Sequence, residues 1–288
     1  MRNHHGLLKK ASAFALAFVL AASALAGCGS ATVELPEDMS MLGELVVVAR
    51  EEGSGTRTTF ESLADTDEEG TDIIASSTDE VIAAVAADIN AIGYIASSAA
   101  ADAEGVKVID INGVSPIAET IQKGSYCLMR TYYLAYQDNL SDVATDFLTF
   151  VLTAGQDIVA ESCVPVKSAQ TFLSDQSEGT VVINGSSSVA PIMEELAQAY
   201  MELNGNAVIE VVTSDSGTGL TAAIRGECDM AMSSRELESY ENELLESSAI
   251  GLDGISIIVN EENPVTDLTL DMITGIYSKT WENWSDIS

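Results

Sequence analysis

The chain has 288 residues and a formal charge of −33, with 45 acidic and 12 basic side chains. So acidic a surface repels nucleic acid and anionic lipid, and any anion site must therefore work through short-range contacts. Both histidines, His4 and His5, lie in an N-terminal segment that we expect to be removed. The rest of the chain then lacks the histidine of Ser-His-Asp and Cys-His catalysis and of histidine-ligated metal sites. We expect a protein that is not an enzyme and needs no cofactor.

The N-terminus has the pattern of a secretory signal. Three basic residues precede an apolar run that ends in small residues: Arg2, Lys9 and Lys10, then ASAFALAFVLAASALA. This run is too short and wrongly flanked for a transmembrane helix. It closes on LAGC, the lipobox pattern, so we predict a signal peptide over 1–27 and a lipid on Cys28. Residues 28–40 would be a tether, and the body would lie at the extracellular face of the cell membrane. An ordinary signal peptide, with Cys28 discarded, is the alternative.

The first half of the body alternates between predicted strands and helices. ELVVVAR (44–50) is a buried strand that leads into a glycine-rich turn and a helix. Ser77-Thr78-Asp79-Glu80 resembles a capping box ahead of the helical VIAAVAADI. Further strands are predicted over 92–97, 106–111 and 126–136, a helix over 141–162, and a polar connector over 168–179.

The alternation then starts again. Strands are predicted over 181–185, 207–214, 229–234 and 255–260, and helices over 186–203, from Ser216 to a stop at Gly226, and over 268–277. Strands that alternate with helices indicate an α/β fold. Three cysteines of the body, Cys127, Cys163 and Cys228, are expected to be small buried apolar residues, and a single disulfide among them stays possible.

Three strands end in turns that are rich in glycine and hydroxyl groups and that open helices. They are Gly53–Thr56, Gly185–Ser188 and Ser214–Gly219. A helix N-terminus offers unpaired N–H groups and a positive dipole end, and glycine lets an anion approach the backbone. Arg50 precedes the first turn and supplies a fork-shaped donor for an oxyanion. Any one turn alone is explained as an N-cap, but three together favour oxyanion capture.

These stretches resemble the phosphate-binding proteins of high-affinity phosphate ABC transporters. VVINGSSSVAPIMEELAQAY, SDSGTGLTAAIRGECDMAMSSREL and GLDGISIIVNEENPVTDLTLDMITGIYSKTWENWSDI are similar to the family's first half. ELVVVAREEGSGTRTTFESL, IGYIAS, VKVIDINGVSPIAETIQKGSYCLMRTYYL and FLTFVLTAGQDIVAESCVPV are similar to its second half. The second half comes first here, so the resemblance implies a circular permutation. A truncated tandem gene or a mis-assigned reading frame would also give this order.

The resemblance implies a type II periplasmic-binding-protein fold, in which two α/β lobes are joined by crossover strands around a ligand cleft. The lobe with the GSGT turn would comprise 41–123 plus 259–288, and the lobe with the GSSS and DSGTG turns would comprise 124–258. Ligand binding would close the lobes by a hinge motion. The implied partners are inorganic phosphate and the membrane permease subunits of the transporter, with the protein itself a monomer that binds no nucleic acid.

The family's phosphate contacts fall on matching positions of this sequence: Arg50, Ser54, Gly55, Thr56, Ser188, Val189 through its N–H, Ser216 and Ser234. Ser187 is an alternative to Ser188. The cations Arg57 and Arg235 are expected to form ion pairs on or between the lobes rather than to bind the ligand.

Ser234 replaces an aspartate that in some family members accepts a hydrogen bond from a protonated phosphate oxygen and so rejects sulfate, which has no proton to donate. Asp215, Glu51 or Glu52 could supply that acceptor here. A receptor for sulfate or molybdate, and a sensor or adhesion protein that has lost its ligand, are the alternative functions. A secreted hydrolase is a third, but it would need a base or a metal cluster beside its serine.

Overall fold

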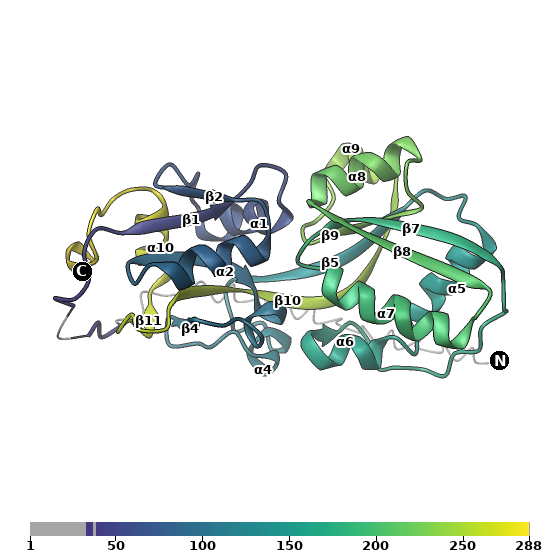
Figure 1. The fold of residues 1–288 in the computed structure, drawn as a ribbon, viewed down its shortest axis with the longest axis horizontal. Coiled ribbons are helices and arrows are strands. Elements are labelled where there is room, and N and C mark those ends of the chain that lie inside the picture. Colours follow the sequence, from purple (N-terminus) through teal and green to yellow (C-terminus); the bar gives the residue numbers. More distant parts are fainter. Residues whose placement is uncertain (1–32, 37–38, 288) are drawn as a thin grey trace, which may run out of the picture.

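The computed structural model describes residues 33–36 and 39–287, so the predicted signal peptide and Cys28 lie outside the described residues. Two α/β units lie side by side along the long axis of the molecule (Figure 1). One hydrophobic cluster, from Leu45 to Leu128 and from Leu252 to Ile287 with Val164, forms the core of the unit that we call lobe A. A second cluster, from Tyr132 to Ile250, forms the core of lobe B.

Lobe A contains β1 (Val46–Arg50), α1 (Gly55–Ala64), β2 (Ile73–Ala75), α2 (Thr78–Ala87), β3 (Ala91–Ala96), α3 (Ser97–Ala100), β4 (Val106–Ile111), α4 (Ala118–Gln122), β11 (Asp267–Leu268), α10 (Leu270–Tyr277) and the 3₁₀ turn η1 (Trp284–Asp286). Lobe B contains α5 (Asp142–Val151), α6 (Gln156–Ser162), β7 (Gly179–Ser186), α7 (Ala190–Leu203), β8 (Ala207–Ser214), α8 (Ser216–Arg225), β9 (Met230–Ser233) and α9 (Ser239–Asn242). The strands β5 (Met129–Tyr136) and β10 (Glu246–Asn260) run between them, and β6 (Val164–Pro165) pairs with β10.

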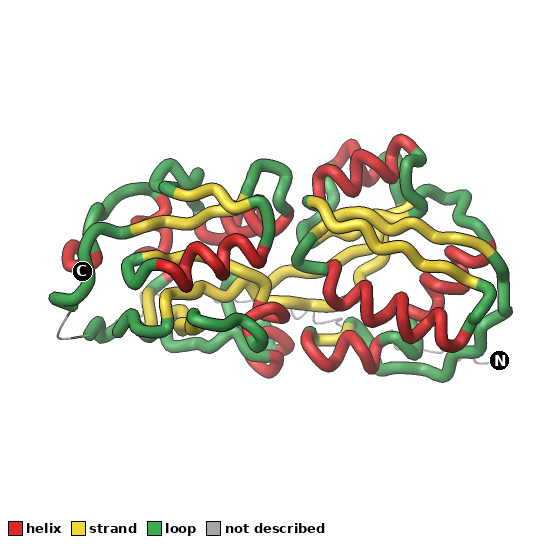
Figure 2. The backbone as a smooth tube through the Cα atoms, in the orientation of Figure 1, coloured by secondary structure: helices red, strands yellow, loops and turns green. Residues whose placement is uncertain are grey.

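The strands pair along one path in the order β2-β1-β3-β10-β5-β9-β7-β8. Residues 255–260 of β10 pair with β3 and β4 in lobe A, whereas residues 246–254 pair with β5. The pairs of β1 with β3 and of β7 with both β8 and β9 are parallel. Helices cover both faces of the strands in each lobe (Figure 2). This layering confirms the predicted α/β class, because parallel strands need cover on both faces.

The prediction of one helix over 141–162 is wrong, since the chain forms two helices, α5 and α6. Gly155 lies at the break and packs so closely on α7 that a Cβ there would lie 2.7 Å from Leu196 Cδ2. The predicted strand over 255–260 is only the second half of the longer β10. Its first half, ESSAIGLDG, has neither a continuous apolar run nor a regular alternation, so it gives no strand signal in the sequence. Among the described residues no single helix is long and apolar enough to cross a membrane.

The segment that precedes β1 pairs with the segment that follows α10. Leu45 N donates to Glu282 O at 2.8 Å, and Trp284 N donates to Gly43 O at 3.2 Å. Trp284 is fully buried in the lobe A core, and its indole N–H donates to Asn90 O. The predicted connector forms neither helix nor strand between 168 and 178, but Phe172 packs on the lobe B core and so fixes its path. Cys127, Cys163 and Cys228 form no disulfide.

Candidate anion-binding site

The three predicted turns lie where strands end and helices begin. Ser54 caps α1 after β1, and Asp215 caps α8 after β8. The predicted turn before α7 begins two residues later than expected, because Gly185 and Ser186 still belong to β7. Gly185 has φ +140°, and a Cβ there would lie 2.3 Å from Met232 O, so only glycine fits between β7 and β9. This close approach brings the end of β7 against the end of β9.

Hydroxyl groups from both lobes meet at these turns. Thr56 Oγ1 of lobe A lies 2.9 Å from Ser188 Oγ of lobe B. Ser186 Oγ donates to Ser234 Oγ at 3.0 Å, and Ser216 Oγ lies 3.3 Å from Ser234 Oγ. All five side chains are buried. We call Thr56, Ser186, Ser188, Ser216 and Ser234 the hydroxyl cluster. It unites four predicted site residues with Ser186, which had been assigned to the turn but not to the site.

The backbones of the two lobes also touch beside the cluster. Gly217 N, at the start of α8, donates to Gly53 O at 3.1 Å. Thr59 Oγ1 on α1 lies 3.4 Å from Ser234 O. Gly55 opens α1 directly against lobe B, where a Cβ would lie 2.4 Å from Ser216 Oγ and 2.6 Å from Ser234 Oγ. The N-termini of α1 and α8 therefore meet at the hydroxyl cluster with their positive dipole ends.

Arg50 ends β1 beside this cluster and is 2% exposed. Its Nε and Nη2 donate to the two carboxylate oxygens of Glu51 at 2.8 and 2.7 Å. Nη2 also donates to Ser187 Oγ across the lobes at 3.2 Å. Among the described residues Nη1 forms no hydrogen bond, so it is the guanidinium nitrogen left for a ligand. The backbone N–H of Arg50 donates to the hydroxyl of Tyr94, and this bond fixes the end of β1.

Two predicted ligands have other bonds in this structure. The N–H of Val189 donates to Ser186 O at 3.0 Å within the turn before α7, so it is occupied. The hydroxyl of Ser54 accepts from Arg57 N as the cap of α1.

Three carboxylates were candidate acceptors for a protonated phosphate oxygen. Of these, Asp215 is engaged in capping α8 through Thr218, and Glu52 is exposed. Glu51 is the carboxylate held at the Arg50 guanidinium.

Arg57 and Arg235 form ion pairs within one lobe rather than between the lobes. Arg57 Nε lies 2.8 Å from Glu61 and 3.1 Å from Glu68, and its Nη1 donates to Arg50 O. Arg235 forms a bidentate pair with Glu241 at 2.7 and 2.8 Å. Both cations therefore support the site without being directed at the hydroxyl cluster.

Arg130 is a site neighbour that the sequence did not reveal. It lies on β5, is 5% exposed, and donates from Nη1 to Thr56 Oγ1 at 2.6 Å. Its Nε and Nη2 donate to Asp253 Oδ2 on β10. The only sequence signal is a charged residue within the otherwise uncharged strand pattern of YCLMRTYYLAY, and the family resemblance did not single it out.

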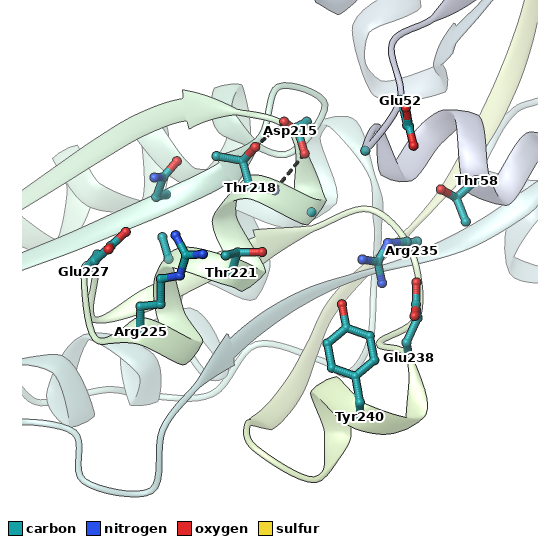
Figure 3. Close-up of a pocket in the computed structure, with 14 residues that line it drawn as sticks. Glu52, Thr58, Asp215, Thr218, Thr221, Arg225, Glu227, Arg235, Glu238 and Tyr240 are labelled. Carbon is teal, nitrogen blue, oxygen red and sulfur yellow. Dashed lines mark hydrogen bonds between the residues drawn. The ribbon is translucent and has the colours of Figure 1, made fainter.

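A polar cavity of about 730 Å³ opens beside the cluster, between the lobes. Glu52, Gly53 and Thr58 line it from lobe A, and Asp215, Gly217, Thr218, Arg225, Arg235 and Tyr240 are among its lining residues from lobe B. Figure 3 shows Glu52 and Thr58 facing Asp215 and Arg235 across this space. Gly53, Asp215 and Gly217 border both the cavity and the meeting helix ends, so the cavity lies directly beside the site.

Behind Arg50, lobe A contains a buried carboxylate. Glu68 is 3% exposed and lies 3.1 Å from Arg57 Nε, and it adopts a left-handed backbone with φ +56°. Burial raises the pKa of Glu68 to about 7 despite the nearby arginine. A carboxyl whose pKa is higher in the folded state stabilises the fold when protonated. This contribution is fully present below the unfolded pKa, near 4.5, and is lost as the pH rises through about 7.

Glu68→Gln is expected to remove this pH dependence. One pKa unit corresponds to about 1.4 kcal/mol, so wild type should lose about 3 kcal/mol relative to the variant between pH 4.5 and pH 8. Urea unfolding of both proteins at the two pH values measures the difference. Glu61→Gln, which changes the partly exposed second partner of Arg57, is the matched control and should follow wild type. Parallel pH profiles of Glu68→Gln and wild type would contradict the prediction.

Comparison with known proteins identifies two matched segments. A family model described as PBP superfamily domain matches residues 41–154 and 171–288. Among curated proteins, the chain is 34% identical over 297 aligned residues to the phosphate-binding protein PstS 2 of Streptococcus agalactiae serotype V, covering 97% of this chain and 98% of that protein. It is 32% identical to PstS 2 of Streptococcus pneumoniae serotype 4, covering 91% and 94%.

A solved structure shows the same similarity. The crystal structure of a phosphate-binding protein of a phosphate ABC transporter from Streptococcus pneumoniae TIGR4 superposes with a TM-score of 0.69 and 32% identity. The superposition covers 85% of this chain and all of that chain. Similarity in sequence and similarity in fold thus lead to the same group of proteins.

Proposed function

The chain belongs to the PBP superfamily and, within it, to the family of its streptococcal PstS 2 relatives, and on that premise we propose that it binds inorganic phosphate between its lobes and delivers it to an ABC transporter. This family consists of transporter substrate-binding proteins and not of enzymes. Proteins of this kind act outside the cytoplasm, where they meet the solute before the membrane transporter does.

One observation supports phosphate most strongly, namely the convergence of two helix N-termini, five buried hydroxyl groups and Arg50 at one point between the lobes. Hydroxyl and backbone N–H groups donate to oxyanions, and a helix N-terminus adds a positive potential. These contacts are local, so they bind an anion although the whole protein is strongly acidic. The proposed ligands are Arg50, Ser54, Gly55, Thr56, Ser188, Ser216 and Ser234, with Val189 N–H joining after its turn rearranges.

Binding would replace the hydroxyl–hydroxyl contacts by contacts to the ligand. Thr56 and Ser188 lie on different lobes, and so do Arg50 and Ser187, which means that one anion between them holds the lobes together. β5 and β10 are the segments on which the lobes would hinge. The proposed lobe boundaries are 41–123 plus 259–288 and 124–258. The two hydrophobic cores follow them only in part, because Tyr126, Leu128, Val164, Ile255 and Ile257 pack in the core of lobe A.

The circular order of the halves remains part of the proposal. In the order that the resemblance implies, the segment that corresponds to NWSDI would lead into the strand that corresponds to VVVAR, whereas the alignments with the PstS 2 relatives extend over nearly the whole of both chains in the order of this chain. Here Glu282–Trp284 pairs with Gly43–Leu45, so these two segments are adjacent in space although the chain does not join them. A permutation needs such adjacency at the old connection and a linker elsewhere. The segment 168–178 would be that linker.

The anchor and the partners also remain proposals. Cys28 would carry a lipid that holds a monomer at the extracellular face of the cell membrane. The closed, ligand-bound form would then dock on the permease subunits of the transporter. Incorporation of a labelled lipid into wild type and not into Cys28→Ser would test the anchor.

Isothermal titration of the purified body, residues 33–288, with phosphate, sulfate and molybdate tests the proposed ligand. We expect tight one-to-one binding of phosphate and at least roughly 100-fold weaker binding of sulfate, because a carboxylate such as Glu51 can accept a hydrogen bond from a protonated phosphate oxygen but would be left facing an unprotonated sulfate. Comparable affinities for sulfate and phosphate would contradict selective phosphate binding and would mean that the site binds oxyanions in general. No binding of any of the three would refute oxyanion transport.

A further inference from the structure

A buried ion pair joins the two strands that link the lobes, beside the hydroxyl cluster. Arg130 on β5 and Asp253 on β10 are partners in the strand register, and both side chains are 1% exposed. Asp253 Oδ2 accepts from Nε and Nη2 of Arg130 at 3.2 and 3.0 Å and from the hydroxyl of Tyr132 at 2.5 Å. Its other oxygen, Oδ1, accepts from Ser98 N at 3.0 Å. The carboxylate is therefore fully hydrogen-bonded.

These contacts fix the direction of the Arg130 guanidinium. The face of Tyr132 lies 4.9 Å from Cζ, and the Tyr132 hydroxyl accepts from Nη2 at 3.0 Å. With Nε and Nη2 held by Asp253 and Tyr132, Nη1 donates to Thr56 Oγ1 at 2.6 Å. A buried ion pair gives little net stability over well-packed apolar residues, so its presence here needs another reason. The bond to Thr56 supplies one.

A hydroxyl has one proton and two lone pairs, and Arg130 occupies a lone pair of Thr56 Oγ1. The proton of Thr56 cannot point at a guanidinium donor, so it is left for another acceptor; Ser188 Oγ lies 2.9 Å away, and either hydroxyl can be the donor in that contact. Hydrogen bonds that share one group polarise one another. The Thr56 hydroxyl is thereby left with its proton for a donor role toward the space between the lobes, where the proposed function places an oxyanion.

We propose that Arg130 is a positioning residue of the anion site, which Asp253 and Tyr132 orient so that the Thr56 hydroxyl donates to the bound oxyanion. The inference rests on the proposed function. Arg130 itself does not touch the ligand and acts through Thr56 alone. Because Arg130 and Asp253 lie on the two linking strands, the same bond also connects the site to the segments on which the lobes hinge.

A double-mutant cycle for phosphate binding tests this role. Arg130→Met and Thr56→Val are each expected to weaken phosphate binding roughly tenfold or more, as expected for loss of one charge-assisted hydrogen bond. The double variant should bind no more than about threefold more weakly than Thr56→Val alone, because Arg130 acts through Thr56. If Arg130 had only a structural role that is independent of Thr56, the fold losses of phosphate affinity in the two single variants would multiply in the double variant. Multiplied losses, or an Arg130→Met affinity within twofold of wild type, would overturn the proposal.

Two further variants keep the result interpretable. Removing one partner of a buried ion pair is strongly destabilising, so the cycle is repeated with Arg130→Met and Asp253→Asn introduced together, a combination that leaves neither charge unpaired. Arg235→Met is the matched control, because it breaks another buried arginine–carboxylate pair that has no contact with Thr56. Its effect on phosphate affinity, whatever its size, should multiply with that of Thr56→Val. Wild type that binds no phosphate would refute the proposed function, whereas a multiplying Arg130 cycle in a phosphate-binding wild type would refute only this inference.

Discussion

Replacement of Arg50 by methionine is expected to weaken phosphate binding by roughly two to four orders of magnitude. Two charge-assisted hydrogen bonds from a guanidinium contribute roughly 3–6 kcal/mol, and each 1.4 kcal/mol is about tenfold in Kd. The loss should lie at the upper end of this range for a second reason. The Glu51 carboxylate, which accepts two hydrogen bonds from Arg50 in this structure, would then stand unpaired beside the anion and repel it.

Arg225→Met is the control for the loss of a positive charge. Arg225 lines the same interlobe cavity but is exposed, so solvent and salt screen it. Its removal should change phosphate affinity less than threefold in titration calorimetry at physiological ionic strength. Circular dichroism and urea unfolding establish that both variants are folded. Equal affinities of the two variants would show that Arg50 interacts with the anion only at long range and is not a ligand.

Local patterns predicted most of the elements that carry the site. The apolar VVVAR strand, the hydroxyl-rich helix starts and the glycine stop of α8 are all written in consecutive residues, and each appears in the structure. The meeting of the three turns is different, because Gly55 and Ser216 come from distant parts of the chain. Only the family resemblance implied that they would lie together. The family resemblance did not indicate, however, that the N–H of Val189 is bonded within its own turn.

Buried charges were the features that the sequence concealed. Glu68 stands in the polar run ADTDEEG, which has the composition of an exposed loop, yet its backbone turns the side chain inward against Arg57. Arg130 and Asp253 pair across 123 positions, and neither strand pattern indicates the partner of the other. Such pairs depend on strand register between distant segments. Register is fixed by the packing of whole lobes, which no local pattern contains.

Gly55→Ala is expected to abolish phosphate binding while leaving the lobes folded. Gly55 is the first residue of α1, and its backbone conformation is one that alanine also adopts. Alanine there should therefore not destabilise lobe A and should favour the helix slightly. Its Cβ, however, would lie 2.4 Å from Ser216 Oγ and 2.6 Å from Ser234 Oγ, both on lobe B. The lobes can avoid this contact by staying apart, and then one anion can no longer bind to both.

The expected result is a loss of phosphate affinity of at least about three orders of magnitude at unchanged or higher midpoint of urea unfolding. Small-angle X-ray scattering should show that phosphate compacts wild type and leaves the variant unchanged. Gly205→Ala is the matched control, because a Cβ at Gly205 has no atom within 4 Å. An alanine variant at position 55 that binds within tenfold of wild type would mean that Ser216 and Ser234 can rotate away without cost. The site would then tolerate a wider separation of the helix ends, and the tight approach of α1 to α8 would not be what confers affinity.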